Sequence, residues 1–371
     1  MLGGTLAAWL TLLAPPLVLA AWLADLPAWP APLLALPLAP IVFGTVMRAL
    51  RGSSARARWL WMQAFGLGAL LLPIVAVGAL LRGALPATTV GALAGVAWAV
   101  VALLANRAAR RVRVARVEVE VDGLERPLRL VQLSDVHVGS RPPAFLADVV
   151  REVAELAPEL VLITGDLLDA SDIAPDALAA LGTLTSSGVP VYLSLGNHER
   201  YTDLPRSIAA IEAEGVRVLR DEAVVHGPVR LIGIDDRDRP DALPGLLARL
   251  ARERSGERPN VLLYHRPDGW AAARAAGVAL MLAGHTHGGQ IWPFGLAVRR
   301  VYPETAGRFD ADGSTLYVSP GTGTWGPVFR LGTRSEMTLV ELVPGAGAPS
   351  GPGSGESVSS VNAAKSRPVS S

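Results

Sequence analysis

The chain has 371 residues, and none of them is cysteine. Without cysteine, disulfide bonds, thiolate nucleophiles and thiolate metal sites are all excluded. Any metal site must therefore be built from oxygen and nitrogen ligands. The same absence leaves the redox compartment of the protein open, because disulfides would be its marker.

Lysine is nearly absent as well. Lys365 is the only one, the other basic residues are arginine, and the formal net charge is +1. A nucleic-acid-binding protein usually gathers basic residues in a patch or stripe, and the sequence has no obvious stripe of this kind. We therefore expect no nucleic-acid partner. The sequence carries no signal for the oligomeric state.

Charge of either sign is scarce before about residue 105, where Ala, Leu, Val and Trp dominate. A helix needs about 20 apolar residues to cross a bilayer. Segments of that length cover residues 2–24, 26–47, 59–81 and 85–105. The second contains five prolines, so a kinked or re-entrant helix is the alternative to a span there. We predict about four transmembrane helices within residues 1–106, with the lipid bilayer as a partner.

The arginines predict how these helices are oriented, because short loops rich in Lys or Arg stay on the cytoplasmic side. Between the second and third segments lie Arg48, Arg51, Arg56 and Arg58. After the fourth segment, in a predicted basic linker at residues 107–116, lie Arg107, Arg110, Arg111, Arg113 and Arg116. An even number of spans puts both clusters on one side. This predicts an integral protein of a bacterial inner membrane with a cytoplasmic C-terminal domain, unless the second segment fails to span.

Residues 117–343 have the pattern of an α/β domain, because short β-branched and Leu-rich runs alternate with amphipathic stretches. Strands are expected at residues 128–133, 160–164, 189–195, 229–234, 261–264, 280–283, 315–318 and 337–342. Helices are expected at residues 144–157, 174–186, 205–214 and 241–254. Residues 344–371 are mainly small and polar, so we expect them to be disordered.

Side chains that bind metals recur where the predicted strands end. They are Asp135 and His137, then Asp166, then Asn197 and His198, then His265, and finally His285 and His287. Loops at the carboxyl ends of an open α/β sheet converge on one crevice, so we expect these side chains to share a pocket. Carboxylate and imidazole ligands together suit Mn, Fe or Zn better than Ca or a water-rich Mg site.

The spacing of these residues supports the same pocket. Residues two apart in an extended segment point to the same side, so Asp135 and His137 can face one pocket, as can His285 and His287. Glycine precedes the ligands at positions 165, 196 and 284 and permits sharp turns there.

In their order and spacing, these blocks resemble the metallophosphoesterase, or calcineurin-like phosphoesterase, superfamily over residues 128–342. Residues 284–290 (Gly-His-Thr-His-Gly-Gly-Gln) and 317–323 (Tyr-Val-Ser-Pro-Gly-Thr-Gly) resemble in particular its bacterial membrane-associated branch and a transmembrane metallophosphoesterase of animals. The resemblance implies a four-layer α-β-β-α sandwich and a centre that holds two divalent metal ions.

The resemblance also implies a role for each ligand. One metal would be held by Asp135, His137, Asp166 and His287. The other would be held by Asp166, Asn197, His265 and His285. Asp166 would bridge ions about 3.5 to 4 Å apart, and a hydroxide between them would attack phosphorus.

His198 directly follows a predicted ligand, and the resemblance implies that it contacts the phosphate or protonates the leaving oxygen. Related phosphatases imply that Asp169 orients His198 by accepting its other ring proton. A structural ion pair is an equally good interpretation of Asp169, and of Glu199. Arg200 and Arg266 flank site residues and are candidates for substrate contact by position alone.

Three further features have plainer interpretations. His226 lies in a turn and is expected at the surface, and residues 235–237 (Asp-Asp-Arg) are expected to form a solvated loop. Trp292, Pro293 and Phe294 follow the last histidine pair. They could form an apolar lip for a lipid-like substrate, insert at the level of the headgroups, or pack beneath the site loop.

Taken together, the sequence favours a membrane-anchored hydrolase of a phosphodiester, a pyrophosphate or a phosphomonoester. A phospholipid or nucleotide-lipid is a candidate substrate because the anchor would hold the site near the bilayer. The alternative is a membrane scaffold or sensor that has lost catalysis, although all predicted ligands are present. A transport protein would be expected to carry charges within its spans, and these segments contain none.

Overall fold

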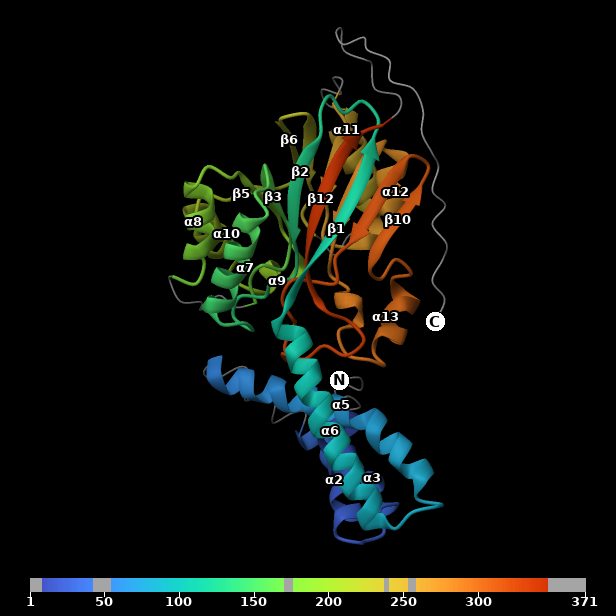
Figure 1. Ribbon diagram of the computed structural model, residues 1–371. Helices are drawn as coiled ribbons and strands as arrows, with labels where there is room; N and C mark the ends of the chain where they lie inside the picture. Colours follow the sequence, from blue (N-terminus) through green and yellow to red (C-terminus); the bar gives the residue numbers. More distant parts are fainter. Residues whose placement is uncertain (1–8, 43–54, 170–175, 237–239, 253–257, 346–371) are drawn as a thin grey trace, which may run out of the picture.

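The computed structural model describes residues 9–42, 55–169, 176–236, 240–252 and 258–345. Apolar helices at the N-terminal end form a stalk, and the end of helix α6 leads directly into an α/β domain (Figure 1). The predicted disordered tail lies outside the described residues, apart from residues 344 and 345.

The first sheet has the strand order β1-β12-β2-β3-β4-β5. Its strands are β1 (Val112–Val121), β12 (Ser335–Pro344), β2 (Leu128–Leu133), β3 (Leu160–Thr164), β4 (Val191–Ser194) and β5 (Arg217–Leu219). Strands β2 to β5 are parallel, β12 is antiparallel to β2, and β1 is parallel to β12. The parallel strands therefore all end at one edge of the sheet.

The second sheet has the strand order β10-β11-β9-β8-β7-β6. Its strands are β10 (Gly307–Ala311), β11 (Ser314–Val318), β9 (Val278–Ala283), β8 (Asn260–Leu263), β7 (Val229–Gly233) and β6 (Glu222–His226). The four inner strands are parallel, and β10 and β6 pair antiparallel at the edges. Both sheets are therefore mixed.

Helices cover the outer face of each sheet. On the first sheet lie α7 (Pro143–Glu155), α8 (Ala179–Ser186) and α10 (Leu204–Ala213), and on the second lie α11 (Leu243–Arg252) and α12 (Trp270–Ala275). Side chains alternate along the strands, so that Leu160 and Leu162 pack between the sheets while Val161 and Ile163 pack against the outer helices. This is the α/β fold that the sequence predicts, with two sheets packed face to face between layers of helix.

All the predicted strands are present, with ends shifted by one or two residues, but β1, β5, β6 and β10 were not predicted. The region predicted as a basic linker, residues 107–116, is largely regular structure instead. Helix α6 continues to Arg110, and β1 begins at Val112. Valine alternates with charged residues in β1, which pairs with β12 over its whole length, so this basic stretch is a strand at the edge of a sheet.

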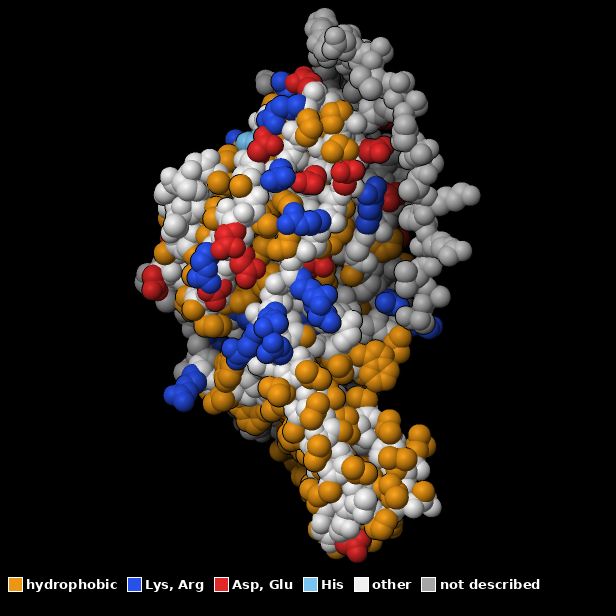
Figure 2. All heavy atoms as spheres, viewed as in Figure 1, with side chains coloured by type: hydrophobic (Ala, Val, Ile, Leu, Met, Phe, Trp, Pro, Cys, Tyr) orange, Lys and Arg blue, Asp and Glu red, His pale blue; other side chains and the backbone are white. Residues whose placement is uncertain are grey.

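The N-terminal helices differ from the predicted set of about four spans. The described elements are η1 (Trp9–Leu13), α2 (Ala14–Leu23), α3 (Pro30–Ala35), η2 (Leu36–Leu38), α5 (Ala55–Leu81) and α6 (Ala87–Arg110). Of the helices described, α5 and α6 are long and apolar enough to cross a membrane, and the others are shorter. A four-helix membrane bundle is therefore not confirmed. In the second predicted span the helix changes to a 3-10 turn that contains Pro37, since proline removes a backbone donor. Apolar side chains cover the outside of the stalk (Figure 2).

The stalk is attached to the α/β domain at residues 325–331. The side chain of Gln63 on α5 accepts a hydrogen bond of 2.9 Å from the backbone N–H of Val328, and Asn106 on α6 donates one of 2.8 Å to its carbonyl. Gly66 faces Pro327 so closely that a Cβ atom there would collide with it. The two long helices are therefore packed directly against a loop of the α/β domain.

Candidate metal centre

The predicted ligands lie at the edge where the parallel strands of both sheets end. Loops after β2, β3 and β4 of the first sheet carry Asp135, His137, Asp166 and Asn197. Loops after β8 and β9 of the second sheet carry His265, His285 and His287. The structure thus brings together side chains that are up to 152 positions apart in the sequence, from Asp135 to His287 (287 minus 135). The pocket predicted at this edge is built by both sheets.

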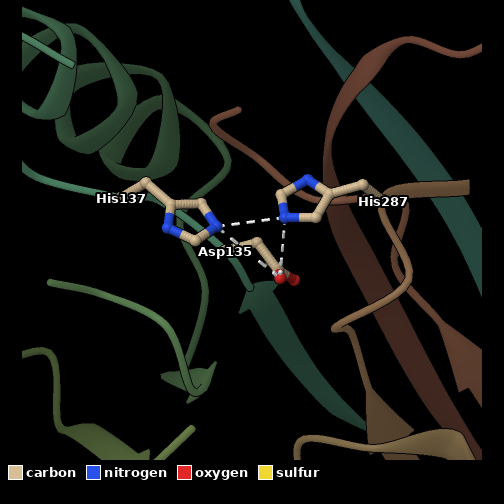
Figure 3. A group of neighbouring side chains, drawn as sticks. All are labelled: Asp135, His137 and His287. Carbon is tan, nitrogen blue, oxygen red and sulfur yellow. Dashed lines mark hydrogen bonds and ion pairs between the residues drawn. The ribbon is translucent and has the colours of Figure 1, made fainter. Parts of the chain in front are cut away.

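Asp135, His137 and His287 form one group of possible ligands and point toward one another (Figure 3). The Nε2 atoms of His137 and His287 are 3.0 Å apart, and Oδ1 of Asp135 is 3.3 Å from Nε2 of His287 and 3.9 Å from Nε2 of His137. All three residues are buried. One cation among these atoms would contact both imidazoles and the carboxylate.

Asp166, His265 and His285 form a second group. Oδ2 of Asp166 is 3.1 Å from Nε2 of His265, which lies 3.3 Å from Nδ1 of His285. Outside the group, Nδ1 of His265 lies 2.7 Å from the carbonyl oxygen of Thr164, which favours a proton on Nδ1 and leaves Nε2 directed at Asp166 and His285.

The backbone is not extended at the two pairs of ligands that are two residues apart, Asp135 with His137 and His285 with His287. Asp135, His137, Asp166, His285 and His287 all have a positive φ, between 51° and 71°. This left-handed conformation is unfavourable for residues with a side chain, and strain of this kind concentrates at functional sites. It also shows that His285 and His287 do not lie on an extended segment, although they join the separate ligand sets that the resemblance implies. The tight turn sends His285 into the second group and His287 into the first.

His198 and Asp169 lie beside the first group. Oδ1 of Asp169 is 2.7 Å from Nδ1 of His198 and 2.6 Å from Nδ1 of His137, and Ser140 donates a hydrogen bond to its other oxygen. The predicted contact between Asp169 and His198 is therefore present, and the same carboxylate also holds a predicted ligand. Nε2 of His198 lies 3.9 Å from Oδ2 of Asp166, so the ring spans the space between Asp169 and the ligands.

Burial and mutual attraction set the charges of the site. Burial lowers the pKa of His137 and His265, but the neighbouring carboxylates outweigh it and raise these values to about 9 and about 10. Burial and the protonated His265 lower the pKa of His285 to about 3. Asp166 is buried too, yet His265 holds its pKa well below the usual range. The carboxylates thus favour the protonated, positively charged forms of His137 and His265 in this buried site.

These residues fit two divalent cations. The two facing imidazole nitrogens of the first group and an oxygen of Asp135 are close enough together to share one cation. Oδ1 of Asn197 is buried with no hydrogen-bond partner, although buried amide oxygens normally have one. Asn197 is flanked by Gly196, which packs against Asp166, and by His198, whose backbone N–H donates to Asp166. The oxygen is therefore available next to the second group.

Of the two interpretations of Glu199, a residue that positions the ligands and a structural ion pair, the structure agrees with the first. The buried carboxylate of Glu199 accepts hydrogen bonds from the backbone N–H groups of Asp166, Leu168 and Gly196, at 3.1, 3.0 and 2.8 Å. Glu199 therefore joins the loops after β3 and β4, and of its two interpretations the ion pair is the wrong one. Its position in the Gly-Asn-His-Glu block was the available signal.

Arg330 was missed entirely. It is one of the largest fully buried side chains, and it donates hydrogen bonds to the carbonyl groups of His287, Pro320, Gly321 and Gly323. The loop that it binds donates from Gly323 N–H to the carbonyl of Asp135 at 2.9 Å. Arg330 thus connects the ligand loops of both sheets, and no motif near position 330 indicated it. Tyr302, whose hydroxyl is 3.2 Å from Nε2 of His285, was missed as well.

Each of the two arginines predicted as substrate contacts pairs with a buried carboxylate. Arg266 pairs with Asp236 at 2.8 Å, and Arg200 pairs with Asp235 at 3.2 Å. The expectation of a solvated acidic loop was therefore wrong, since Asp235 and Asp236 are buried. Buried carboxylates need such partners. His226 is half-buried against Tyr192, away from the site.

Of the three interpretations of residues 292–294, packing beneath the site loop is the one that the structure disfavours. Trp292 is 51% exposed and Phe294 is 37% exposed. Helix α13 (Gly295–Val301) follows and exposes Leu296 and Val301. It lies at the end of the domain that faces the stalk (Figure 1).

Comparisons with known proteins agree with this geometry. The family model described as calcineurin-like phosphoesterase matches residues 128–289. An uncharacterized metallophosphoesterase of Helicobacter pylori is 32% identical over 241 residues, covering 63% of this chain and 65% of that protein. The transmembrane protein with metallophosphoesterase domain of Bos taurus is 35% identical over 268 residues, covering 63% and 58%. The phosphodiesterase YaeI of Escherichia coli is 28% identical over 237 residues, covering 58% and 83%. The chain therefore matches less than two thirds of the length of the first two relatives.

Replacing Glu199 with glutamine should loosen the metal centre. The amide would turn an N–H toward one of the three backbone donors, and a buried donor left without a partner costs roughly 1–3 kcal/mol. We expect Glu199→Gln to lower both the melting temperature and the metal content per chain, measured by thermal unfolding and elemental analysis. The matched control is Glu212→Gln on the exposed face of α10. Equal values for the two variants would show that Glu199 does not support the site.

Proposed function

Because this chain contains a calcineurin-like metallophosphoesterase domain, we propose that it is a metal-dependent phosphoric ester hydrolase anchored in a membrane. The observation that carries the proposal is the pair of ligand groups, each of which combines side chains from both sheets. The substrate is a phosphodiester, a pyrophosphate or a phosphomonoester. A scaffold without catalysis would not need to keep strained backbone at five ligand positions.

Two divalent ions, Mn, Fe or Zn, would be held by the residues of this site. Asp135, His137 and His287 would hold one, Asn197, His265 and His285 the other, and Asp166 would be shared. Such ions, when bound, neutralise charge on the phosphoryl oxygens and make water a stronger nucleophile. The buried walls around the ligands exclude bulk water, which strengthens every charge interaction inside.

His198 is placed to move a proton. Asp169 lies next to Nδ1, which favours a proton on that nitrogen and leaves Nε2 directed toward the ligands. When Nε2 carries a proton as well, the ring can donate that proton to the oxygen that leaves the phosphorus, while Nδ1–H stays bound to Asp169. Asp169 does not touch the reacting atoms, so its role is to position His198 and His137.

The stalk supports anchoring in the membrane. Helices α5 and α6 are long enough to cross a bilayer, and large apolar residues such as Leu80, Val96 and Leu103 are 66–82% exposed on them. Arginines gather where the stalk meets the domain (Figure 2). Arginines in such a position usually stay on the cytoplasmic side, and on this ground we propose that the catalytic domain faces the cytoplasm. Exposed Trp292 and Phe294 would then lie near the headgroups.

The full-length protein in detergent, supplied with Mn, should hydrolyse a chromogenic phosphate ester. We expect release of nitrophenol from bis(p-nitrophenyl) phosphate, from p-nitrophenyl phosphate, or from both, because the site offers ligands for two cations. Chelation with EDTA and the Asp166→Asn variant should each reduce the rate to background. Two metals bound per chain with no turnover of either ester would favour a scaffold instead.

Removing the proton donor should slow turnover without emptying the metal centre. We expect His198→Ala to lower kcat by roughly a hundredfold to ten-thousandfold, as is usual for a general acid. Metal content, measured by elemental analysis, should remain that of the wild type. His226→Ala, which alters a histidine outside the site, is the matched control. Unchanged kcat in His198→Ala would exclude this role.

The absence of cysteine makes the orientation directly testable. Ser186→Cys places a thiol on the exposed end of α8, and Gly83→Cys places one in the loop between α5 and α6. In intact spheroplasts a membrane-impermeant maleimide should label Gly83→Cys, and it should label Ser186→Cys only after permeabilisation. The reverse pattern would place the catalytic domain outside the cytoplasm.

A further inference from the structure

A cavity of about 890 Å³ extends from Asp169 and His198, which lie beside the first ligand group, to the beginning of α5. Asp169 and His198 line one end of it, and Trp59 and Met62 of α5 line the other. The wall between them includes Trp325. The cavity is therefore bounded by the α/β domain on one side and by a candidate membrane-spanning helix on the other.

Aromatic and apolar side chains form much of this wall. The ring of Trp325 lies 6.1 Å from the ring of His198 in an edge-to-face arrangement, and the ring of Tyr201 lies 5.3 Å from it on its own side. Val328 adds an aliphatic surface. Trp325 and Tyr201 are 55% and 73% exposed, which is unusual for large aromatic side chains beside a buried site.

The position of Trp325 is held from two sides. The side chain of Gln290 accepts from Trp325 N–H and donates to its carbonyl, both at 3.0 Å. Gln63 of α5 binds the backbone N–H of Val328, three residues further on. The loop is thus held both by the residue that follows the last metal-ligand block and by the stalk. Trp325 is therefore exposed at a position that these hydrogen bonds fix.

The cavity also has a charged rim. Arg56 and Arg58 of α5 and Arg110 at the end of α6 line it, against the carboxylate of Asp148, so the charge balance at this end is positive. Arginine at the boundary between an apolar helix and water is well suited to anionic lipid headgroups. Apolar walls, a positive rim and an opening toward His198 therefore occur in one cavity.

We propose that this cavity binds the substrate, and that the substrate is a membrane lipid that carries a phosphate ester. Its hydrocarbon chain would lie along Trp59, Met62 and Val328, and its phosphate would reach the metal centre past His198. The arginines would attract the remaining negative charge of the headgroup. This inference rests on the proposed hydrolase function and adds to it that helix α5 forms part of the substrate site.

Two alkyl chains of different length provide the test. Dodecyl and ethyl p-nitrophenyl phosphates, or the corresponding alkyl phosphates if only monoesters are cleaved, are given to the full-length protein in detergent. Hydrolysis is followed by phosphorus NMR, so that cleavage of either ester bond is seen. Each methylene removed from water is worth roughly a fourfold gain, so a few buried methylenes should raise kcat/KM for the dodecyl ester more than tenfold.

The matched variants are Trp59→Ala and Trp61→Ala. Both tryptophans lie on α5, with 38% and 37% exposure, but Trp61 does not line the cavity. Trp59→Ala should reduce the ratio of dodecyl to ethyl kcat/KM at least about fivefold, whereas Trp61→Ala should leave the ratio unchanged. This comparison cancels partitioning of the dodecyl ester into detergent, which is the same for both variants.

The outcomes separate this inference from the proposed function. If kcat/KM for the ethyl ester equals that for the dodecyl ester, the lipid cavity is refuted while the hydrolase stands. The same holds if both variants change the ratio of the two values equally. If neither ester nor the nitrophenyl compounds are hydrolysed by the metal-loaded protein, the hydrolase function itself fails.

Discussion

The carboxylate of Asp135 connects the two sheets at the place where the site forms. Asp135 belongs to the first sheet, and its two oxygens accept from the backbone N–H of His285, which belongs to the second, at 3.2 and 3.1 Å. Ser134 donates to the same carboxylate at 2.6 Å. One buried negative charge thus fixes the spacing between the sheets and helps to form the first ligand group. A neighbouring contact, from Gln132 of β2 to the carbonyl of Ala283 at the end of β9, holds the same edge closed.

This arrangement explains why so many buried polar groups surround the ligands. Carboxylates and imidazoles that are removed from water are unstable unless their charges are compensated. The positive charge of Arg330 attracts Asp135 and supplies part of the compensation, and the proposed cations would supply the rest. Glu199 acts differently, because it holds the backbone N–H groups of the ligand loops. The strained left-handed backbone at Asp135, Asp166 and His287 is tolerated because these hydrogen bonds fix it on both sides.

The stalk also contacts the loop that supports the ligands. The loop at residues 325–331 touches α5 and α6 on one side and the ligand loops on the other, through Arg330 and the Gln290 side chain. A catalytic fragment that began at residue 117 would lose half of β1 as well as α5. The domain boundary predicted at residue 117 from the change in composition therefore falls inside strand β1.

By itself, the sequence determined the α/β class, the central strands and the residues that meet at the metal centre, because hydrophobic runs and the ends of strands are local features. It could not identify β1, since alternating Val and Arg in a basic stretch becomes a strand only where β12 is available to pair with it. The different directions of His285 and His287, and the burial of Asp235 and Asp236 against arginines, were likewise decided by tertiary structure. Each depends on backbone turns and partners that are distant in the sequence, and local composition does not encode where those partners will lie.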